Sequence, residues 1–237
     1  MTVLESAERF TEAAARPSPW RRRLVVAALV LLAGIAVWAI WFSSLLAVKE
    51  VRILGTQDVP SGEVRAAAAV RVGEPLARID VDGIVERVGA IPAVGSVEVR
   101  RGWPDVLVVV VSERVPLAVV RTAGSLQYVD ATGARFGAPS STAARLPFVR
   151  SGGEASLRSA LGVLAALPES ERVRVVSVVA RSRDDVVLRL RSGATVQWGS
   201  PEASDRKLAV LLALLPRKAA HYDVSAPDLP TTRGTLR

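Results

Sequence analysis

Residues that could carry out chemistry are few in this sequence, which contains one histidine, His221, and no cysteine. A lone imidazole at the start of an expected strand lacks the neighbouring groups that would orient it as a general base. No set of His, Asp and Glu residues has the spacing of metal ligands. We therefore expect no metal and no cofactor, and interpret His221 as a structural or partner-facing residue.

Two further patterns also fail to predict an active site. Asp184 and Asp185 are adjacent, so on a strand they would point to opposite faces and could not share one substrate; a turn is the better interpretation. Gly152 and Gly153 lack the preceding strand and the helix register of a phosphate loop. We expect a protein that is not an enzyme and has no small-molecule substrate.

The dominant feature is the apolar stretch Leu24–Val48, which contains no charged side chain and directly follows Arg21-Arg22-Arg23. A helix of this length would reach roughly 37 Å, against a hydrocarbon core of about 30 Å. The stretch is longer than the apolar region of a cleaved signal peptide and has no Ala-x-Ala at its end, and Trp38 and Trp41 stand toward its outer end. We predict one permanent transmembrane helix.

Flanking charges predict its orientation. Arginines are denser before the stretch than the basic residues directly after it, so the N-terminus is expected in the cytoplasm and the bulk outside, as in a single-pass type II protein of the cell membrane. The predicted parts are a cytoplasmic tail (1–23), the transmembrane helix (24–48), a small domain (49–115), a larger domain (116–227) and a C-terminal tail (228–237).

The formal net charge of +8 does not by itself indicate nucleic acid. Arginines alternate with Val and Leu along expected strands, as in Leu188-Arg189-Leu190-Arg191, and solvent-facing strand positions explain them. No cluster combines aromatic and basic residues in the way that nucleic-acid binding requires. We therefore expect no nucleic-acid partner.

The small domain has the pattern of an α+β unit in the order β-α-α-β-β. Its predicted elements are Val48–Leu54, Glu63–Val70, Val81–Gly89, Val94–Arg101 and Val106–Glu113. The last two strands flank Gly102-Trp103-Pro104-Asp105, which has the composition of a hairpin turn. Two helices on one face of a three-stranded sheet follow from this order.

These residues carry a resemblance. Arg100-Arg101-Gly102-Trp103-Pro104, followed by Glu113-Arg114-Val115-Pro116, resembles the POTRA domain of the FtsQ/DivIB family of bacterial cell-division proteins. One departure is Pro60, which stands where the family often has a Ser or Thr cap, and Ser61 is the expected substitute. The resemblance implies an α+β protein in which the POTRA domain directly follows a single span.

The larger domain resembles the β domain of the same family, a curved, mostly antiparallel sheet with two helices. The predicted helices are Ser156–Leu167 and Ser204–Ala219. The predicted strands or extended pieces are Pro116–Arg121, Leu126–Asp130, Ala134–Phe136, Leu146–Val149, Val173–Ala180, Val186–Leu190, Thr195–Trp198 and His221–Val224.

The resemblance implies a non-enzymatic scaffold of the divisome at the division septum. Its implied partners are bitopic proteins similar to FtsB/DivIC and FtsL, other divisome proteins, and through them the septal peptidoglycan synthase. Two alternatives are open at this point. One is a component of protein export or envelope assembly, where POTRA units also occur; the other is a protein that binds or hydrolyses the cell wall.

The expected mode of partner capture is strand addition, because a terminal strand presents unpaired N–H and C=O groups on one edge. We predict this edge at His221, Tyr222, Asp223, Val224 and Ser225, with Pro227 and Pro230 limiting its extent. Tyr222→Lys or Val224→Pro should then weaken capture. Trp103 and Trp198 are candidates for either partner contact or structural packing; for Trp103 we expect the structural role.

Overall fold

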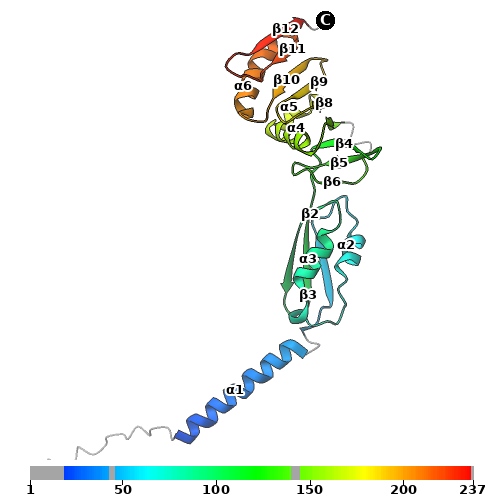
Figure 1. Ribbon diagram of the computed structural model, residues 1–237. Coiled ribbons are helices and arrows are strands. Elements are labelled where there is room, and N and C mark those ends of the chain that lie inside the picture. Colours follow the sequence, from blue (N-terminus) through cyan, green and yellow to red (C-terminus); the bar gives the residue numbers. More distant parts are fainter. Residues whose placement is uncertain (1–18, 43–45, 140–144, 236–237) are drawn as a thin grey trace, which may run out of the picture. The chain divides into compact units, whose positions relative to one another are not determined.

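A computed structural model describes residues 19–42, 46–139 and 145–235. The first element is α1 (Pro19–Phe42), drawn in blue in Figure 1. By length and composition its segment Trp20–Ala39 can cross a membrane, and none of that segment is buried inside the protein. The expected cytoplasmic tail falls mostly outside the described residues.

The apolar stretch extends beyond the helix. Ala47 and Val48, which we assigned to the transmembrane helix, are 3% and 0% exposed. Ala47 forms a β-bridge with Pro75, and the Val48 N–H donates to the Glu74 oxygen at 2.9 Å. The predicted end of the span is thus corrected, because these two apolar residues are buried by protein.

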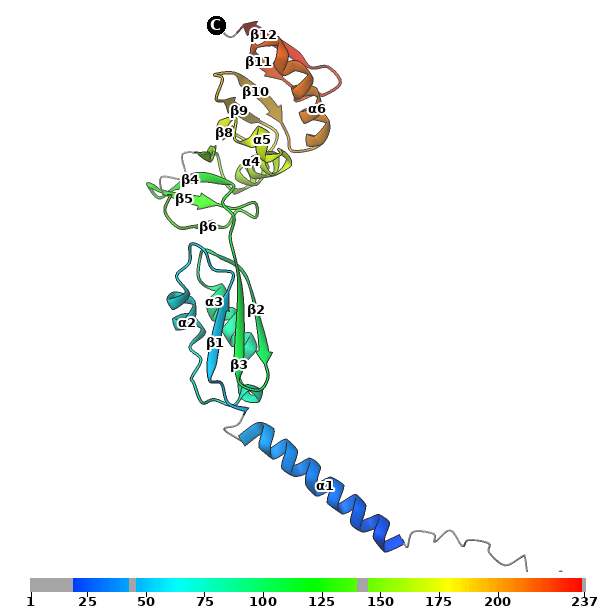
Figure 2. The same cartoon turned by 180° about the vertical axis from the view of Figure 1, so that it is seen from behind.

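A three-stranded sheet follows, with strands in the order β1 (Glu50–Leu54), β3 (Val106–Glu113) and β2 (Val94–Gly102). Its helices are α2 (Ser61–Ala68), η2 (Leu76–Arg78) and α3 (Val81–Gly89). Figures 1 and 2 show α2 and α3 on one side of the sheet. The predicted β-α-α-β-β order is confirmed.

Side-chain periodicity explains these elements. Leu107, Val109 and Val111 alternate along β3 and are buried, as expected for one face of a strand. Ile84 and Val88 lie four residues apart on α3 and are buried too. The expected cap at Ser61 is wrong: the N-cap is Pro60, which offers no side-chain hydrogen bond, and Ser61 is the first helical residue.

The larger sheet has nine strands in the order β12-β11-β10-β9-β8-β7-β4-β5-β6. Neighbours are antiparallel except for the parallel pairs β10/β11, β4/β7 and β7/β8. The strands are β4 (Ala118–Thr122), β5 (Ser125–Val129), β6 (Arg135–Phe136), β7 (Phe148–Ser151), β8 (Val175–Ala180), β9 (Val186–Leu190), β10 (Thr195–Gly199), β11 (Ala219–Asp223) and β12 (Thr231–Thr235).

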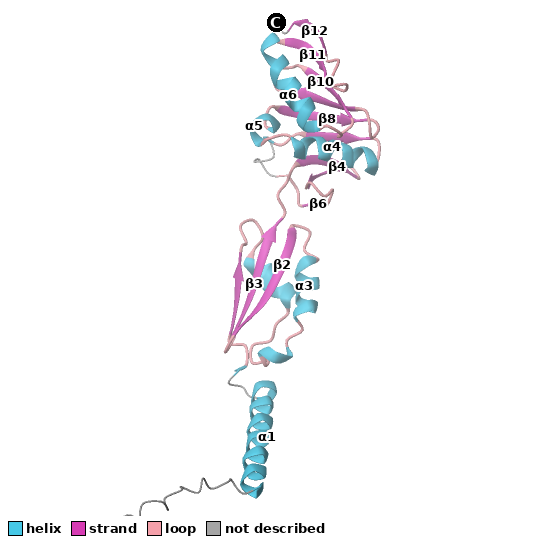
Figure 3. Ribbon diagram, turned by 90° about the vertical axis from the view of Figure 1, so that its left-hand side faces the viewer, coloured by secondary structure: helices cyan, strands magenta, loops and turns pink. Residues whose placement is uncertain are grey.

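Helices α4 (Glu154–Ala166) and α6 (Ser204–Leu214) pack their apolar side chains against this sheet (Figure 3). Leu157, Leu161 and Leu164 of α4 are in one core cluster with alternate residues of β8, β9 and β10 and with Leu211 of α6. Burial of each leucine side chain stabilises the folded state by about 1.5–3 kcal/mol relative to exposure to water. The mostly antiparallel sheet with two helices is confirmed. The short α5 (Glu169–Arg172) was not predicted. The predicted helix Ser204–Ala219 is divided into α6 and η4 (Leu215–Arg217), and its last residue, Ala219, begins β11.

Candidate protein-binding edge

The strand that we predicted to be terminal lies inside the sheet. β11 pairs with β10 on one side, His221 being opposite Thr195, and with β12 on the other, His221 being opposite Arg233. The prediction of an edge at residues 221–225 is therefore wrong, because an additional strand follows it. Within the described residues, the free edge at this end of the sheet belongs to β12.

The predicted edge residues are largely structural. Tyr222 and Val224 are 1% and 0% exposed. The Tyr222 hydroxyl accepts from the Ala219 N–H at 2.9 Å and donates to the Leu215 oxygen at 3.3 Å, and the Val224 N–H donates to Gln197 at 3.0 Å. Tyr222→Lys would therefore damage the core, so it cannot report on partner capture alone.

The remaining three predicted residues are more accessible. His221 and Asp223 are half-buried, and Ser225 is exposed. Ser225 donates from its N–H and its hydroxyl to Asp223 Oδ1, at 3.0 and 2.7 Å. This turn leads out of β11 toward β12. A direct partner contact of these residues stays a prediction.

β12 has the features of a short, accessible edge. It begins directly after Pro230 and consists of Thr231, Thr232, Arg233, Gly234 and Thr235, all of them exposed except the half-buried Thr232. Gly234 has φ of +66°, and a Cβ there would lie 3.2 Å from that of Ala220. The pairing with β11 nevertheless continues to Thr235, which is opposite Ala219, so among the described residues β12 is paired along one edge and unpaired along the other.

Trp198 is a core residue. It is 0% exposed, and its Nε1–H donates to Ser204 Oγ at 3.1 Å. Ser204 in turn donates to the Pro201 oxygen at 2.7 Å. Nearby, Lys207 Nζ donates to the Ser200 oxygen at 2.8 Å, and burial lowers the pKa of this lysine. These contacts hold the first turn of α6 against the end of β10.

Trp103 has different surroundings. It lies in the turn between β2 and β3 and is 52% exposed. About half of its ring is therefore accessible to a partner, and the packing that it contributes is smaller than that of a buried tryptophan. The structural role that we expect for Trp103 stays a prediction.

Asp185, one of the two adjacent aspartates considered for chemistry, is held by hydrogen bonds from neighbouring side chains. Asp185 accepts from Gln197 Nε2 at 3.1 Å and from Arg181 Nη1 at 3.0 Å, and these bonds lower its pKa. Asp184 is exposed and next to it in the connection before β9, as the turn interpretation requires. Within the described part of the chain, no group of three or more His, Cys, Asp or Glu side chains is arranged to hold a metal ion.

Gly152 and Gly153 do follow a strand, contrary to our expectation, because β7 extends to Ser151. The Gly152 N–H donates to the Ala180 oxygen at 3.0 Å. A Cβ on Gly152 would lie 2.8 Å from the main-chain oxygen of Arg181. Close approach of two backbones therefore explains the glycine at 152.

Asp130 organises the turn that follows β5. Its Oδ1 accepts from the Thr132 N–H, the Thr132 hydroxyl and the Ala134 N–H at 2.9, 2.6 and 3.0 Å. Its Oδ2 accepts from Arg114 Nη1 at 2.7 Å. Burial opposes ionisation of this carboxyl, but the bonds from Thr132, Arg114 and Ala134 outweigh burial and lower its pKa.

We expect Asp130→Asn to lower the free energy of unfolding by about 1–3 kcal/mol at pH 7, since it weakens bonds to an ionised, buried group. The folded-state pKa of Asp130 is depressed. The stabilisation by its ionised carboxylate is therefore complete above the unfolded-state pKa of about 3.9, and it is lost as the pH falls through the folded-state pKa. Thermal unfolding from pH 7 to pH 3 measures this: the gap between wild type and variant should narrow as the pH falls below about 3.9. An equal gap at both pH values would contradict the assignment, and Asp184→Asn, at an exposed carboxylate, should show no gap.

One apolar N-terminal helix, a β-α-α-β-β unit and a larger mixed sheet define a POTRA-domain protein with a candidate membrane anchor. The sequence model of the FtsQ-type POTRA domain matches residues 46–114. The model of the C-terminal domain of the cell division protein FtsQ/DivIB matches residues 118–229.

Curated relatives agree with these matches. The chain is 40% identical over 228 residues to the cell division protein FtsQ of Streptomyces bingchenggensis (strain BCW-1), covering 90% of this chain and 86% of the relative. It is 36% identical over 231 residues to FtsQ of Streptomyces venezuelae, covering 91% and 84%. FtsQ of Mycolicibacterium smegmatis is 33% identical over 215 residues, covering 89% of this chain and 64% of the relative. The chain belongs to the FtsQ family of bacterial cell-division proteins.

Proposed function

We propose that this protein is a non-enzymatic scaffold of the divisome that captures a strand of a bitopic division protein on the free edge of β12. The observation that carries the proposal is the place of β12 at the end of the nine-stranded sheet. Main-chain N–H and C=O groups on such an edge can continue the ladder into a partner strand. The partners would be similar to FtsB/DivIC and FtsL.

The opposite end of the sheet is less suited to this role. β6 consists of only Arg135 and Phe136, and Phe136 is 7% exposed. Two residues offer few main-chain groups, whereas β12 offers five residues. Strand addition therefore favours the β12 end.

The anchoring helix gives the scaffold its location. Arg21, Arg22 and Arg23 lie in α1 before its apolar part, so the N-terminus is proposed to be cytoplasmic and both sheets to be outside the membrane. From there the protein would recruit or regulate septal cell-wall synthesis through its partners. The alternative of an export or envelope-assembly component has no specific observation in its favour, since both domains match FtsQ-type models.

Imaging tests this function. We expect a fluorescent fusion of the full chain to form a ring at midcell, and depletion of the protein to cause filamentation with septal wall synthesis lost. A uniform envelope signal, together with normal division and failed export after depletion, would contradict the proposal. A fusion lacking residues 228–237 should still reach the membrane, because α1 is intact.

A further inference from the structure

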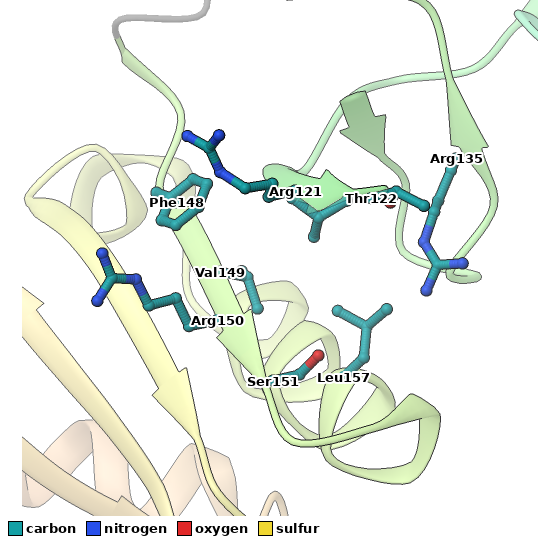
Figure 4. A pocket seen from close by; sticks show the side chains of 9 residues that line it. Arg121, Thr122, Arg135, Phe148, Val149, Arg150, Ser151 and Leu157 are labelled. Carbon is teal, nitrogen blue, oxygen red and sulfur yellow. The ribbon is translucent and has the colours of Figure 1, made fainter. Parts of the chain in front are cut away.

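The nine-stranded sheet opens between β4 and β7. These strands pair at only two positions, Val119 with Phe148 and Val120 with Val149. Beyond them, each strand stays paired on its other side only, β4 with β5 and β7 with β8. A pocket of about 390 Å³ lies in the gap (Figure 4). Its polar lining side chains are Arg121, Thr122, Arg135, Arg150 and Ser151.

Two of these three guanidinium groups have no carboxylate partner in the part of the chain that the structure describes. Arg135 pairs with Glu154 of α4. Arg121 donates from Nη1 to the Gly124 oxygen at 3.2 Å, which leaves its charge uncompensated. Within the described residues, neither Arg121 nor Arg150 forms an ion pair with a carboxylate. The pocket therefore keeps a net positive charge.

A second pocket, of about 460 Å³, adjoins the first, because Phe148 and Arg150 line both. This second pocket extends across neighbouring strands from β7 to Arg189 of β9. Phe148 is paired with Ser177 of β8, and Ser177 is paired with Arg189. With neighbouring strands about 4.8 Å apart, Phe148 and Arg189 are about 10 Å apart. The hydroxyls of Ser177 and Thr195 line the same pocket.

The charged residues that line the two pockets are all arginines. Neither has a carboxylate among its lining residues. We call the surface formed by Arg121, Arg150 and Arg189 around Phe148 the arginine depression. Figure 4 shows Arg121 and Arg150 near the Phe148 ring, and the Arg150 Cζ is 5.8 Å from the centroid of that ring.

Such a surface suits an anion with several oxygen atoms. A guanidinium donates two parallel bonds to a phosphate or a carboxylate, and such bonds are stronger than neutral ones. The serine and threonine hydroxyls add further donors, which favours phosphate because it offers more acceptor oxygens than a carboxylate. The Phe148 ring provides apolar surface beside these donors.

We propose that the arginine depression binds phosphate groups of an anionic envelope molecule, either a phosphodiester polymer or a phospholipid headgroup. Arg150 and Arg189, which both line the second pocket, would hold the charge, and Phe148 would contact the carbon skeleton next to it. This second site does not include the β12 edge. It would connect the scaffold to charged material of the envelope independently of its protein partner.

Calorimetric titration of the full chain in zwitterionic nanodiscs tests the proposal, with inorganic phosphate and a soluble glycerol phosphate oligomer as probes. We expect Arg150→Gln/Arg189→Gln to weaken oligomer binding by about tenfold or more, because two charge-assisted contacts are lost. Arg158→Gln/Arg217→Gln removes the same charge at exposed residues outside both pockets. This control should bind as the wild type does.

Additional titrations distinguish a lipid headgroup from a phosphodiester polymer, and phosphate from carboxylate ligands. Tighter binding to nanodiscs containing phosphatidylglycerol than to the oligomer, lost in the same double variant, would assign a lipid headgroup. Oligomer binding that is equal in the wild type and the Arg150/Arg189 variant would overturn the site. Acetate or polyglutamate binding as tightly as the phosphate probes would overturn the ligand class in favour of an acidic peptide.

Discussion

Proline at Thr232 or Arg233 is expected to abolish or strongly weaken capture of the partner strand, by about tenfold or more, because proline removes an N–H and its ring obstructs the ladder. Adjacent residues of a strand direct their N–H groups to opposite edges. One variant therefore removes a donor from the free edge, and the other removes one from the pairing with β11. The two should differ in stability although both lose capture.

The two proline variants are measured with the full chain and its cognate bitopic partner, by pulldown for capture and by thermal unfolding for stability. Thr232→Ala and Arg233→Ala keep the main-chain donors at the same positions and should retain capture to within about threefold, since side chains on an edge add less than the ladder itself. If both proline variants captured the partner as well as the alanine variants do, strand addition at β12 would be excluded.

Trp198→Ala should have the largest effect on stability, a loss of about 3–5 kcal/mol of unfolding free energy. The side chain is 0% exposed, so its removal leaves a cavity between β10 and α6, and it also leaves Ser204 without its donor. For a domain of this size each kcal/mol lowers the melting temperature by roughly 3–6 °C. Circular dichroism of the full chain in detergent measures the shift.

Two matched variants separate packing from hydrogen bonding at this site. Trp198→Phe keeps an aromatic ring but loses the indole N–H, and Ser204→Ala removes the acceptor of that N–H together with the bond to the Pro201 oxygen; each should cost less than Trp198→Ala. Trp103→Ala, at the 52% exposed tryptophan, should cost about 1 kcal/mol. A melting temperature for Trp198→Ala equal to that of the wild type would show that the ring is not part of the core.

Hydrophobic pattern predicted most of the fold, because most elements bury one face. β9 (Val186–Leu190) and α3 (Val81–Gly89) were predicted to the residue, since each alternates or repeats apolar side chains at the period of its structure. The predicted hairpin around Gly102 was found in the same place. These elements needed only local sequence information.

The terminal strand could not be predicted in this way. Thr231–Thr235 has no apolar side chain and contains a glycine, so nothing in its pattern distinguishes it from a loop. Its support is the ladder to β11, a contact between segments that the sequence does not reveal. For this reason the predicted edge was assigned one strand too early, at His221–Ser225.

Two other differences have similar causes. Ala47 and Val48 are apolar whether lipid or protein surrounds them, so composition could not separate the span from the folded unit. The arginine depression depends on the parallel pairing of β4 with β7 and on their separation after two positions. Parallel pairing joins distant segments and leaves no local signal.

Hydrogen–deuterium exchange of the full chain, with and without its bitopic partner, tests the central claim most directly. β12 is at the free edge of the sheet, so those amides of Thr231–Thr235 that point away from β11 should exchange quickly in the free protein. The account predicts that the partner slows exchange at alternate residues of β12, where main-chain hydrogen bonds form. Unchanged exchange throughout β12, with protection appearing elsewhere on the protein, would contradict it.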